Sequence, residues 1–215
     1  MQRTLQPELL DTLAPTDPAA LQNRRDLRIT NRLMGNHRWF EQVLPSLLPP
    51  GERVLELGAG TGELGQRLAG NGVAIDGLDL WPRPADWPAH HEWHRANLLE
   101  FSGYAPYAAV VGNLIFHQFS EQELNGLGKK LRQNSRVILA CEPLRRRFSQ
   151  ALFSVFGRML GANRVSLHDA RVSIAAGFRG DELPQSLGLA ADEWDCRCFT
   201  TALGAYRMIA VRRPA

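Results

Sequence analysis

From residue 51 onward, short apolar runs alternate with amphipathic segments, a pattern typical of strands connected by helices. Several of these runs are apolar throughout, which indicates strands buried on both faces in a mostly parallel sheet. The expected strands are 53–57, 74–79, 91–94, 108–113, 136–141, 193–200 and 206–212. The expected helices are 63–69, 121–132, 144–160 and 181–187, with further helical structure near 168–173. The pattern therefore predicts an α/β fold with helices on both faces of the sheet.

The last two expected strands are separated by only five residues, 201–205, which is short enough for an antiparallel hairpin. At 215 residues, the chain is long enough for one α/β domain with a full core and short for two. We expect the main domain to cover residues 51–215.

The first 50 residues follow a different pattern. Residues 1–20 are punctuated by prolines and predict a loosely ordered arm. Residues 21–50 carry apolar side chains at three- and four-residue spacing, which predicts helices, and Gly35 and Asn36 divide them into two. We expect these helices to form an N-terminal cap on the main domain.

Composition narrows the class of protein. The 25 Lys and Arg residues exceed the 22 Asp and Glu residues by only three, and they are scattered rather than clustered. This distribution argues against a nucleic-acid surface. Without an apolar run of membrane-spanning length or a signal-peptide pattern, we expect a cytoplasmic protein with no stable membrane insertion. His91 and His94 cannot point the same way in a regular strand, so no metal site is expected.

The clearest chemical signal is a glycine loop that follows the first strand of the main domain. The sequence Val-Leu-Glu-Leu-Gly-Ala-Gly-Thr-Gly at 54–62 places Gly58, Gly60 and Gly62 between a buried strand and a helix. A loop without Cβ atoms lets the backbone approach a ligand closely. Where a dinucleotide-binding fingerprint would have its third glycine, this chain has Glu63. Glu56, just before the loop, suits a ligand with cationic groups better than a diphosphate.

This strand–loop–helix segment resembles motif I of the class I S-adenosylmethionine-dependent methyltransferases. The resemblance extends over residues 20–215 and implies S-adenosylmethionine as the cofactor, which carries an ammonium and a sulfonium. It also implies a Rossmann-like sheet of seven strands whose last strand inserts antiparallel. In such sheets, ligands bind beyond the carboxyl ends of the strands, so the residues there are candidates.

Two strand ends supply candidates for the adenosine part of the cofactor. Asp79 ends the second strand and can accept hydrogen bonds from both ribose hydroxyls, although a strand-terminal Asp can also be a turn cap. Leu80 follows it and can cover the adenine face. At the third strand, the resemblance implies an aspartate that accepts from the adenine amino group, beside a backbone amide. This chain has Asn97 and Leu98 there, and Asn97 lacks the charge assistance of an aspartate.

The end of the fourth strand corresponds to motif IV, which faces both the methyl donor and the acceptor in the family. The segment after Asn113 lacks the prolines of amino-methylating enzymes, and Asn-Leu-x-x-His resembles small-molecule methyltransferases instead. His117 is either a general base, as a neutral imidazole with a pKa of about 6.5, or a capping or core histidine. His37 and His168 are the alternative bases.

Two further expectations concern the acceptor pocket and the cofactor carboxylate. The apolar stripe of the helix expected at 144–160 is either core packing or part of an acceptor pocket, with Phe116 and Phe148 as its walls. In this fold, the N-terminal helices close over the methionine end of the cofactor. Arg38 is the first candidate to pair with the cofactor carboxylate, with Arg28 and Arg32 as rivals.

The sequence thus predicts a methyltransferase (EC 2.1.1.-) acting on a small, largely apolar acceptor, first of all a phenolic or quinol hydroxyl. Three alternatives stay open at this point. One is a methyltransferase-like binding subunit with little or no catalysis, and another is C- or N-methylation of a small molecule. The third is a nicotinamide-dependent oxidoreductase, which Glu56 and Glu63 disfavour. The oligomeric state is left open by the sequence.

Overall fold

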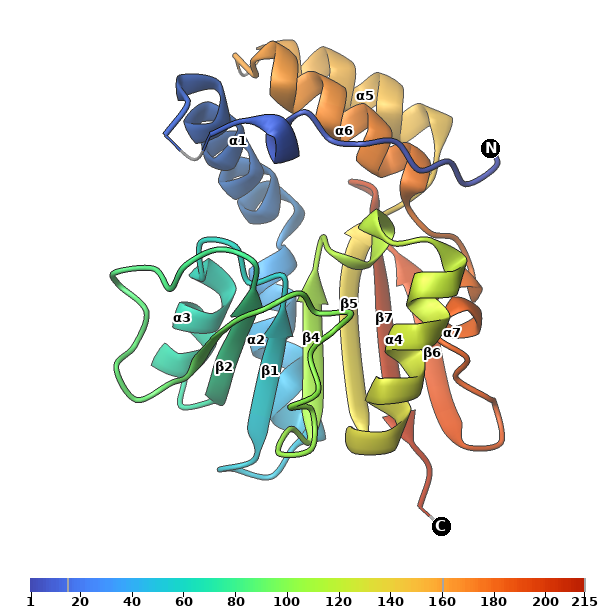
Figure 1. The fold of residues 1–215 in the computed structure, drawn as a ribbon. Helices are drawn as coiled ribbons and strands as arrows, with labels where there is room; N and C mark the ends of the chain where they lie inside the picture. The colour runs from blue at the N-terminus through green and yellow to red at the C-terminus, as the bar shows by residue number, and fades with distance from the viewer. Residues whose placement is uncertain (15, 160, 215) are drawn as a thin grey trace.

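Seven strands form a single sheet in the order β3-β2-β1-β4-β5-β7-β6 (Figure 1). The computed structural model describes residues 1–14, 16–159 and 161–214. The strands are β1 (Arg53–Leu57), β2 (Ala74–Asp79), β3 (Trp93–Arg95), β4 (Ala109–Asn113), β5 (Val137–Pro143), β6 (Trp194–Thr200) and β7 (Ala205–Arg212). Strands β1 to β5 are parallel, and β7 lies antiparallel between β5 and β6. The predicted α/β fold and its antiparallel terminal hairpin are confirmed.

The helices cover both faces of this sheet and its upper edge (Figure 1). They are α1 (Pro18–Met34), α2 (Asn36–Leu47), α3 (Glu63–Gly70), α4 (Glu121–Asn134), α5 (Arg147–Met159), α6 (Arg164–Ala176) and α7 (Glu182–Ser186), with short 3-10 turns η1 (Leu10–Thr12) and η2 (Phe116–Gln118). Gly35, in the left-handed conformation at φ 64°, separates α1 from α2 at the predicted division.

Two apolar clusters, one on each face, hold the helices to the sheet. One cluster joins α4 and α7 to the sheet through residues such as Leu124, Leu127 and Leu183, all essentially inaccessible to water. The other joins α2 and α3 through Phe40 and Leu68. Burial of apolar surface on this scale is the main source of stability for the sheet layers.

The element boundaries differ from the prediction mostly in the upper part of the molecule. Helix α1 begins at Pro18, where the Asp17 side chain accepts a hydrogen bond from the Ala19 amide and caps the helix. Helix α5 begins at Arg147 because Leu144 still bridges to Phe178 beside β5. Leu160, the last residue expected in this helix, lies outside the described residues, as do Pro15 and Ala215.

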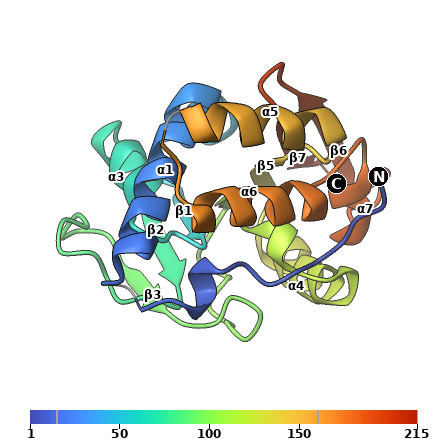
Figure 2. The same ribbon diagram turned by 90° about the horizontal axis from the view of Figure 1, so that it is seen from above.

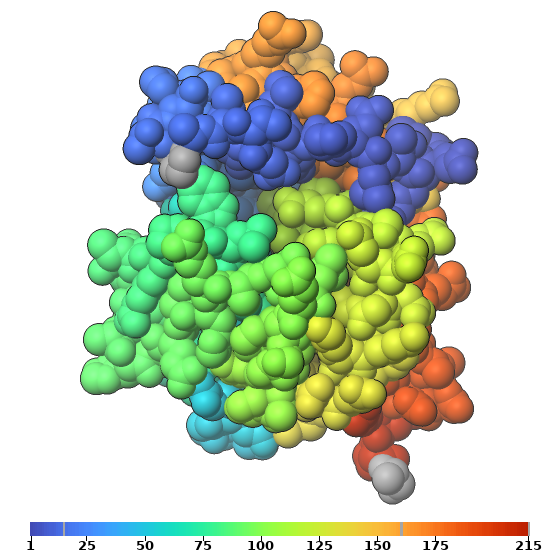
Figure 3. Space-filling model, in the orientation of Figure 1, coloured from blue at the N-terminus to red at the C-terminus, as the bar shows by residue number. Residues whose placement is uncertain are grey.

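A cap of α1, α5 and α6 lies over the carboxyl ends of the parallel strands (Figures 1 and 2). The N-terminal arm before α1 crosses this edge and runs along α6; it is the dark blue band in Figure 3. Hydrogen bonds fix it there: the Thr4 amide donates to the Ala175 carbonyl, and the amides of Leu9 and Leu10 donate to Asp169 of α6. The arm is therefore an ordered strap rather than the loose segment that its prolines predicted.

Candidate active site

The glycine loop connects the end of β1 to the start of α3. Gly58, Gly60 and Gly62 all adopt positive φ values, of 61°, 55° and 76°. Side chains other than glycine rarely adopt this conformation, which explains the alternating glycines of the sequence. The Gly58 amide donates to the Leu78 carbonyl at 2.9 Å, so the loop turns over the end of β2.

The three glycines leave room for different neighbours. A Cβ at Gly58 would lie 2.5 Å from the Ile115 side chain, and one at Gly62 would lie 2.8 Å from the buried Trp87 ring. A Cβ at Gly60 would meet nothing closer than the Gly58 carbonyl oxygen at 3.9 Å. Two of the glycines are thus required by internal packing, and Gly60 is the one with an open side.

Asp79 ties this loop to the end of β2. Its Oδ2 accepts from the Gly60 amide at 2.7 Å, and its Oδ1 accepts from the Trp81 amide at 2.8 Å. Burial raises the pKa of Asp79, against the lowering effect of these backbone bonds. Beside it, Leu80 is exposed, and the Arg24 guanidinium of α1 lies 4.4 Å from the Trp81 ring centroid. Both carboxylate oxygens therefore already hold the loop that a ligand would touch.

The side chains after β3 have structural partners. The Asn97 Oδ1 accepts from the Leu99 amide at 3.0 Å and so caps a turn. Leu98 is buried in the core next to α4, and its carbonyl accepts from the Tyr104 hydroxyl at 2.8 Å. A role in binding adenine stays a prediction for both residues.

Unpartnered acceptor oxygens gather on one face of the sheet, near the ends of β1 and β4. Glu56 and Asn113 share the parity of Val54 and Val111, so both point to the α2–α3 face. The Asn113 amide nitrogen donates to Asn31 at 3.2 Å. Within the described chain, Glu56 Oε2 and Asn113 Oδ1 are buried without a hydrogen-bond partner. Burial raises the pKa of Glu56 to about 8. Such acceptors suit a bound cation, because an ammonium group only donates.

Of the three arginines considered for a ligand carboxylate, Arg28 is the one placed beside the glycine loop. Its Nε lies 3.4 Å from the carboxylate of Glu63, the first residue after Gly62. Arg38 is exposed on α2, where its charge helps to lower the pKa of Glu41. Arg28 thus lies beside the start of α3, whereas Arg38 acts on Glu41 within α2. Pairing with a ligand carboxylate stays a prediction for both residues.

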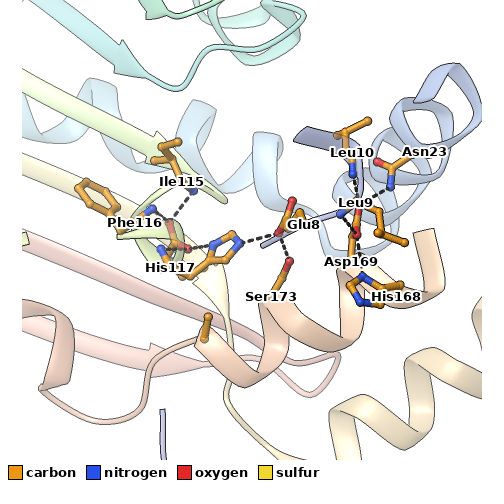
Figure 4. A network of polar contacts seen from close by, with 12 residues as sticks. Glu8, Leu9, Leu10, Asn23, Ile115, Phe116, His117, His168, Asp169 and Ser173 are labelled. Atoms are coloured by element: carbon orange, nitrogen blue, oxygen red, sulfur yellow. Dashed lines mark hydrogen bonds and ion pairs between the residues drawn. The ribbon is translucent and has the colours of Figure 1, made fainter. Parts of the chain in front are cut away.

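His117 lies in the 3-10 turn after β4 and is almost fully buried (Figure 4). Its Nδ1 is 2.6 Å from Oε2 of Glu142, the penultimate residue of β5. The Glu142 carboxylate also accepts from the backbone amides of residues 115, 116 and 117 at 2.8–3.2 Å. This set of bonds fixes the position of the imidazole ring and of the turn that carries it.

The other imidazole nitrogen faces the N-terminal arm. His117 Nε2 lies 3.4 Å from Oε1 of Glu8, and the Ser173 hydroxyl of α6 donates to the same oxygen (Figure 4). Sequence reasoning missed Glu8 and Ser173, because contacts that span 109 and 165 residues leave no local pattern. In the sequence, Glu142 appears only as an acidic residue before Pro143 at the end of an apolar run.

These two carboxylates change the expected charge of His117. Burial lowers its pKa, but Glu142 and then Glu8 outweigh burial and raise the pKa to about 9. The ring is therefore protonated at neutral pH, unlike the neutral imidazole assumed from the sequence. Of the alternative bases, His37 has a pKa lowered to about 4, first by burial and then by Arg67. His168 is bonded to Asp169 at 3.1 Å.

A pocket of about 290 Å³ opens beside His117. The arm contributes Leu5, Pro7 and Glu8 to its walls, and α6 contributes Val172 and Ser173. The predicted wall residues lie elsewhere. Phe116, the first residue of η2, is fully buried in the core, and Phe148 is exposed on the surface of α5. The pocket is thus lined by the arm, α6 and η2, and neither the arm nor α6 was expected to supply its walls.

A second polar cluster lies at the edge of the sheet, away from His117. Asp76, Glu92 and His94 bring three potential metal-ligand atoms within 4.8 Å of one another. However, Asp76 already accepts hydrogen bonds from Arg53 and from the Glu92 amide at 2.7 Å. Arg53 supplies the positive charge at this cluster, so these residues form an ion-paired structural contact.

Comparison with known proteins gives a fold but no close relative. No protein-family model and no curated protein matches the sequence. The plantazolicin methyltransferase BpumL, solved with SAH, is 13% identical, with a TM-score of 0.68 over 93% of this chain and 92% of that one. The magnesium protoporphyrin IX methyltransferase ChlM of Synechocystis PCC 6803, also solved with SAH, is 14% identical, with a TM-score of 0.56 over 95% and 91%.

A third structure, titled for the conversion of a disulfide bond into a thioacetal group in echinomycin biosynthesis, is 19% identical, with a TM-score of 0.57 over 83% and 80%. At these identities the likeness concerns the arrangement of the chain. Together with the strand order and the glycine loop, it shows that this protein has the fold of the class I S-adenosylmethionine-dependent methyltransferases.

Proposed function

We propose that this protein binds S-adenosylmethionine and transfers its methyl group to a small acceptor. The observation that carries the proposal is the pairing of an open glycine loop with buried, unpartnered acceptor oxygens at the same edge of the sheet. Glu56 Oε2 and Asn113 Oδ1 lack donors, and an ammonium group supplies only donors. A pyrophosphate, as in a nicotinamide cofactor, offers only acceptors and would leave these oxygens without donors.

The cofactor would be held by residues at the ends of β1, β2 and β4. Asp79 would accept from the ribose hydroxyls with its remaining lone pairs, and Gly60 would allow close approach. Glu56 and Asn113 would accept from the ammonium group, and Arg28 would pair with the carboxylate. When bound, the cofactor supplies an electrophilic methyl group on a sulfonium. Holding the acceptor in line with that group accounts for much of the rate in such a reaction.

The pocket beside His117 is the candidate acceptor site. Its volume of about 290 Å³ lies near the lower end of the range for small-molecule sites. Leu5, Pro7 and Val172 give it apolar walls, and His117 is its buried basic group. These features suit a phenolic or quinol hydroxyl on a small ring system.

His117 would act on the acceptor hydroxyl through Nε2. Glu142 holds Nδ1, so Nε2 is the atom left to exchange a proton. The 3.4 Å distance between His117 Nε2 and Glu8 Oε1 is long for a hydrogen bond. The hydroxyl oxygen of the methyl acceptor can therefore replace Glu8 as the partner of Nε2. With a pKa of about 9, only about one ring in a hundred is neutral at pH 7 and able to accept a proton from a phenol, whose pKa is about 10. The rate on a hydroxyl acceptor should therefore rise with pH up to about 9.

The cofactor assignment is tested by calorimetry with S-adenosylhomocysteine and, separately, with NADH. We expect binding of the first only. Asp79→Ala should weaken it by about 1.5–3 kcal/mol, the range for hydrogen bonds to charged groups. Unchanged binding by this variant would remove Asp79 from the ribose site, and binding of NADH instead would replace the proposal by an oxidoreductase.

The acceptor is tested by incubating the protein with labelled S-adenosylmethionine and a panel of phenols, quinols, amines and carbon acids. Mass spectrometry of the labelled product then identifies the methylated atom. Label on oxygen supports the hydroxyl acceptor, and label on carbon or nitrogen corrects it. Cofactor binding without any turnover would favour the methyltransferase-like binding subunit.

A further inference from the structure

Helix α5 has its bulky apolar face toward solvent. Phe148 is 63% exposed, Val155 55%, Phe156 52% and Met159 75%. The residues that α5 buries are small ones, Ser149 and Gly157. A helix on the surface of a protein normally shows the reverse arrangement, with its apolar stripe on the core.

The spacing places these side chains on a single face. Phe148, Val155 and Met159 are seven and then four residues apart, and Phe156 lies next to them on the helix surface. The opposite side of α5 packs on α6. There, a Cβ at Gly157 would lie 3.0 Å from the Leu167 side chain, and Gln150 donates to the Arg171 carbonyl. Contact with α6 therefore leaves the apolar face uncovered.

The turn between β6 and β7 extends this apolar face beyond the helix. Leu203, in that turn, is 56% exposed. The next residue, Gly204, accepts a hydrogen bond from the Leu144 amide at 2.9 Å, and a Cβ at Gly204 would lie 3.0 Å from Ser149. Figure 2 shows this turn beside α5. Exposed apolar side chains concentrated in this way mark an interaction site more often than scattered ones do.

The charged side chains along this part of the chain have one sign. Between Glu142 and Asp169 the sequence has no acidic residue and five arginines: Arg145, Arg146, Arg147, Arg158 and Arg164. Arg145 is engaged with Glu182, whereas Arg146, Arg147 and Arg158 are exposed on or beside α5. On the helix, Arg147 and Arg158 lie eleven residues apart and so share one side, at the edge of the apolar face.

We propose that this surface docks on an anionic lipid bilayer, with α5 lying in the plane of the interface. We call it the α5 surface: Phe148, Val155, Phe156, Met159 and Leu203, with Arg146, Arg147 and Arg158. An amphipathic helix binds in this way by placing apolar side chains among the acyl chains and cationic ones among the anionic headgroups. The inference goes beyond methyl transfer and does not depend on it.

The docking is peripheral. Among the described residues, no helix has the length and apolar character needed to cross a bilayer. Helix α5, with 13 residues, covers only a short stretch of interface. Binding would therefore be reversible, and it would weaken with salt because part of the attraction is electrostatic.

The test is co-sedimentation of the full chain with two kinds of vesicle, phosphatidylcholine alone and phosphatidylcholine with phosphatidylglycerol. We expect at least tenfold stronger binding to the anionic vesicles, reduced by added salt. Each arginine near an anionic surface contributes about fivefold in affinity. The double variant Arg147→Glu/Arg158→Glu should therefore remove most of the preference for anionic vesicles.

The apolar contribution is tested by Phe156→Glu/Met159→Glu, which should weaken vesicle binding at least tenfold. Both side chains are exposed, so the fold should tolerate them, and an unchanged thermal melting curve verifies this. Leu33→Glu, at an apolar side chain 60% exposed on α1, is the matched apolar control. Lys129→Glu, at an exposed lysine of α4, is the matched charge control. Both controls should bind like the unmodified protein.

Several outcomes would overturn the proposal. One is absence of binding to anionic vesicles, and another is equal binding by the α5 variants and the controls. A third is a concentration-dependent dimer, seen by analytical ultracentrifugation without lipid, that Phe156→Glu/Met159→Glu dissociates. That last result would assign the α5 surface to a second copy of this chain instead of a membrane.

Discussion

Glu56 and Glu142 occupy equivalent places in the sheet, yet their surroundings are opposite. Each is the penultimate residue of a parallel strand, β1 or β5, and both are buried. Glu142 accepts three backbone hydrogen bonds and pairs with the His117 ring at 2.6 Å. Glu56 Oε2 makes no hydrogen bond of normal geometry among the described residues. The nearby Gly65 amide lowers the pKa of Glu56, but burial outweighs it and raises the pKa to about 8.

The two carboxylates therefore differ in whether the protein itself supplies groups that compensate their burial. A buried carboxylate is costly unless hydrogen bonds or a cation compensate it. At β5 the protein itself provides the cation, because Glu142 helps to keep His117 protonated. At β1 the described residues place no cationic side chain against Glu56, and burial raises the pKa of its carboxyl group. We therefore expect substitutions at β5 to affect catalysis and stability, and substitutions at β1 to affect ligand affinity.

The largest expected effect is on turnover, through His117. If Nε2 accepts the acceptor's proton, His117→Ala lowers kcat on a hydroxyl acceptor by roughly 10²–10⁴, the range for a lost general base. Affinity for S-adenosylhomocysteine should stay nearly unchanged, because the ring pairs with Glu142 of β5 and is not among the residues proposed to bind the cofactor. Steady-state kinetics and calorimetry on the same variant measure the two effects. Retention of most activity would make His117 a structural residue, with His37 and His168 next to test.

The second prediction concerns stability at the β5 site. In Glu142→Gln, an amide nitrogen replaces one of the oxygens, and at the Oε2 position it would face the His117 N–H groups. Breaking a buried ion pair in this way typically costs about 3–5 kcal/mol of unfolding free energy. Denaturant unfolding measures this loss. If Glu142→Gln unfolds like the unmodified protein, the pair contributes nothing to stability.

The pH dependence of stability distinguishes the two carboxylates. His117 has a raised pKa, so its stabilising effect is complete below about pH 6.5 and is lost as the pH rises through about 9. Glu56 also has a raised pKa, so its contribution is lost between about pH 4.5 and 8. Glu142→Gln should remove the change in unfolding free energy above pH 8. Glu56→Gln should remove the change in unfolding free energy below pH 6.5.

The third prediction is the ligand affinity of Glu56→Gln. The amide oxygen of Gln can still accept from an ammonium group but lacks the charge assistance of a carboxylate, so binding of S-adenosylhomocysteine should weaken by about 1.5–3 kcal/mol. Stability at pH 7 should rise, because the neutral amide avoids the loss of stability that the raised pKa of Glu56 causes between about pH 4.5 and 8. In the unmodified protein, binding should release a proton, which calorimetry detects as a heat that varies with the buffer. A buffer-independent heat would contradict pairing with Glu56.

The sequence predicted the sheet well because its signals are local. Each parallel strand is a short apolar run, and the glycines at 58, 60 and 62 indicate backbone positions with positive φ. The candidates near β1 follow from the same local signals, and their role in binding stays a prediction. The partners of His117 could not be predicted, because they come from β5, the arm and α6 at separations that no periodicity reveals. The stripe on α5 was also misleading: its apolar face points to solvent, so Phe148 does not line the pocket beside His117.

The smallest expected effect comes from Glu8, the weaker partner of His117. Its carboxylate lies 3.4 Å from Nε2 and is partly exposed on the arm, whereas Glu142 lies at 2.6 Å and is fully buried. Glu8→Gln should therefore lower the pKa of His117 by less than Glu142→Gln does, leaving kcat within about tenfold of the unmodified protein. NMR titration of the imidazole measures the pKa, and Ser173→Ala, which keeps the charge of Glu8, is the matched control. Equal effects of Glu8→Gln and Glu142→Gln would show that the arm, and not only the sheet, sets the charge of His117.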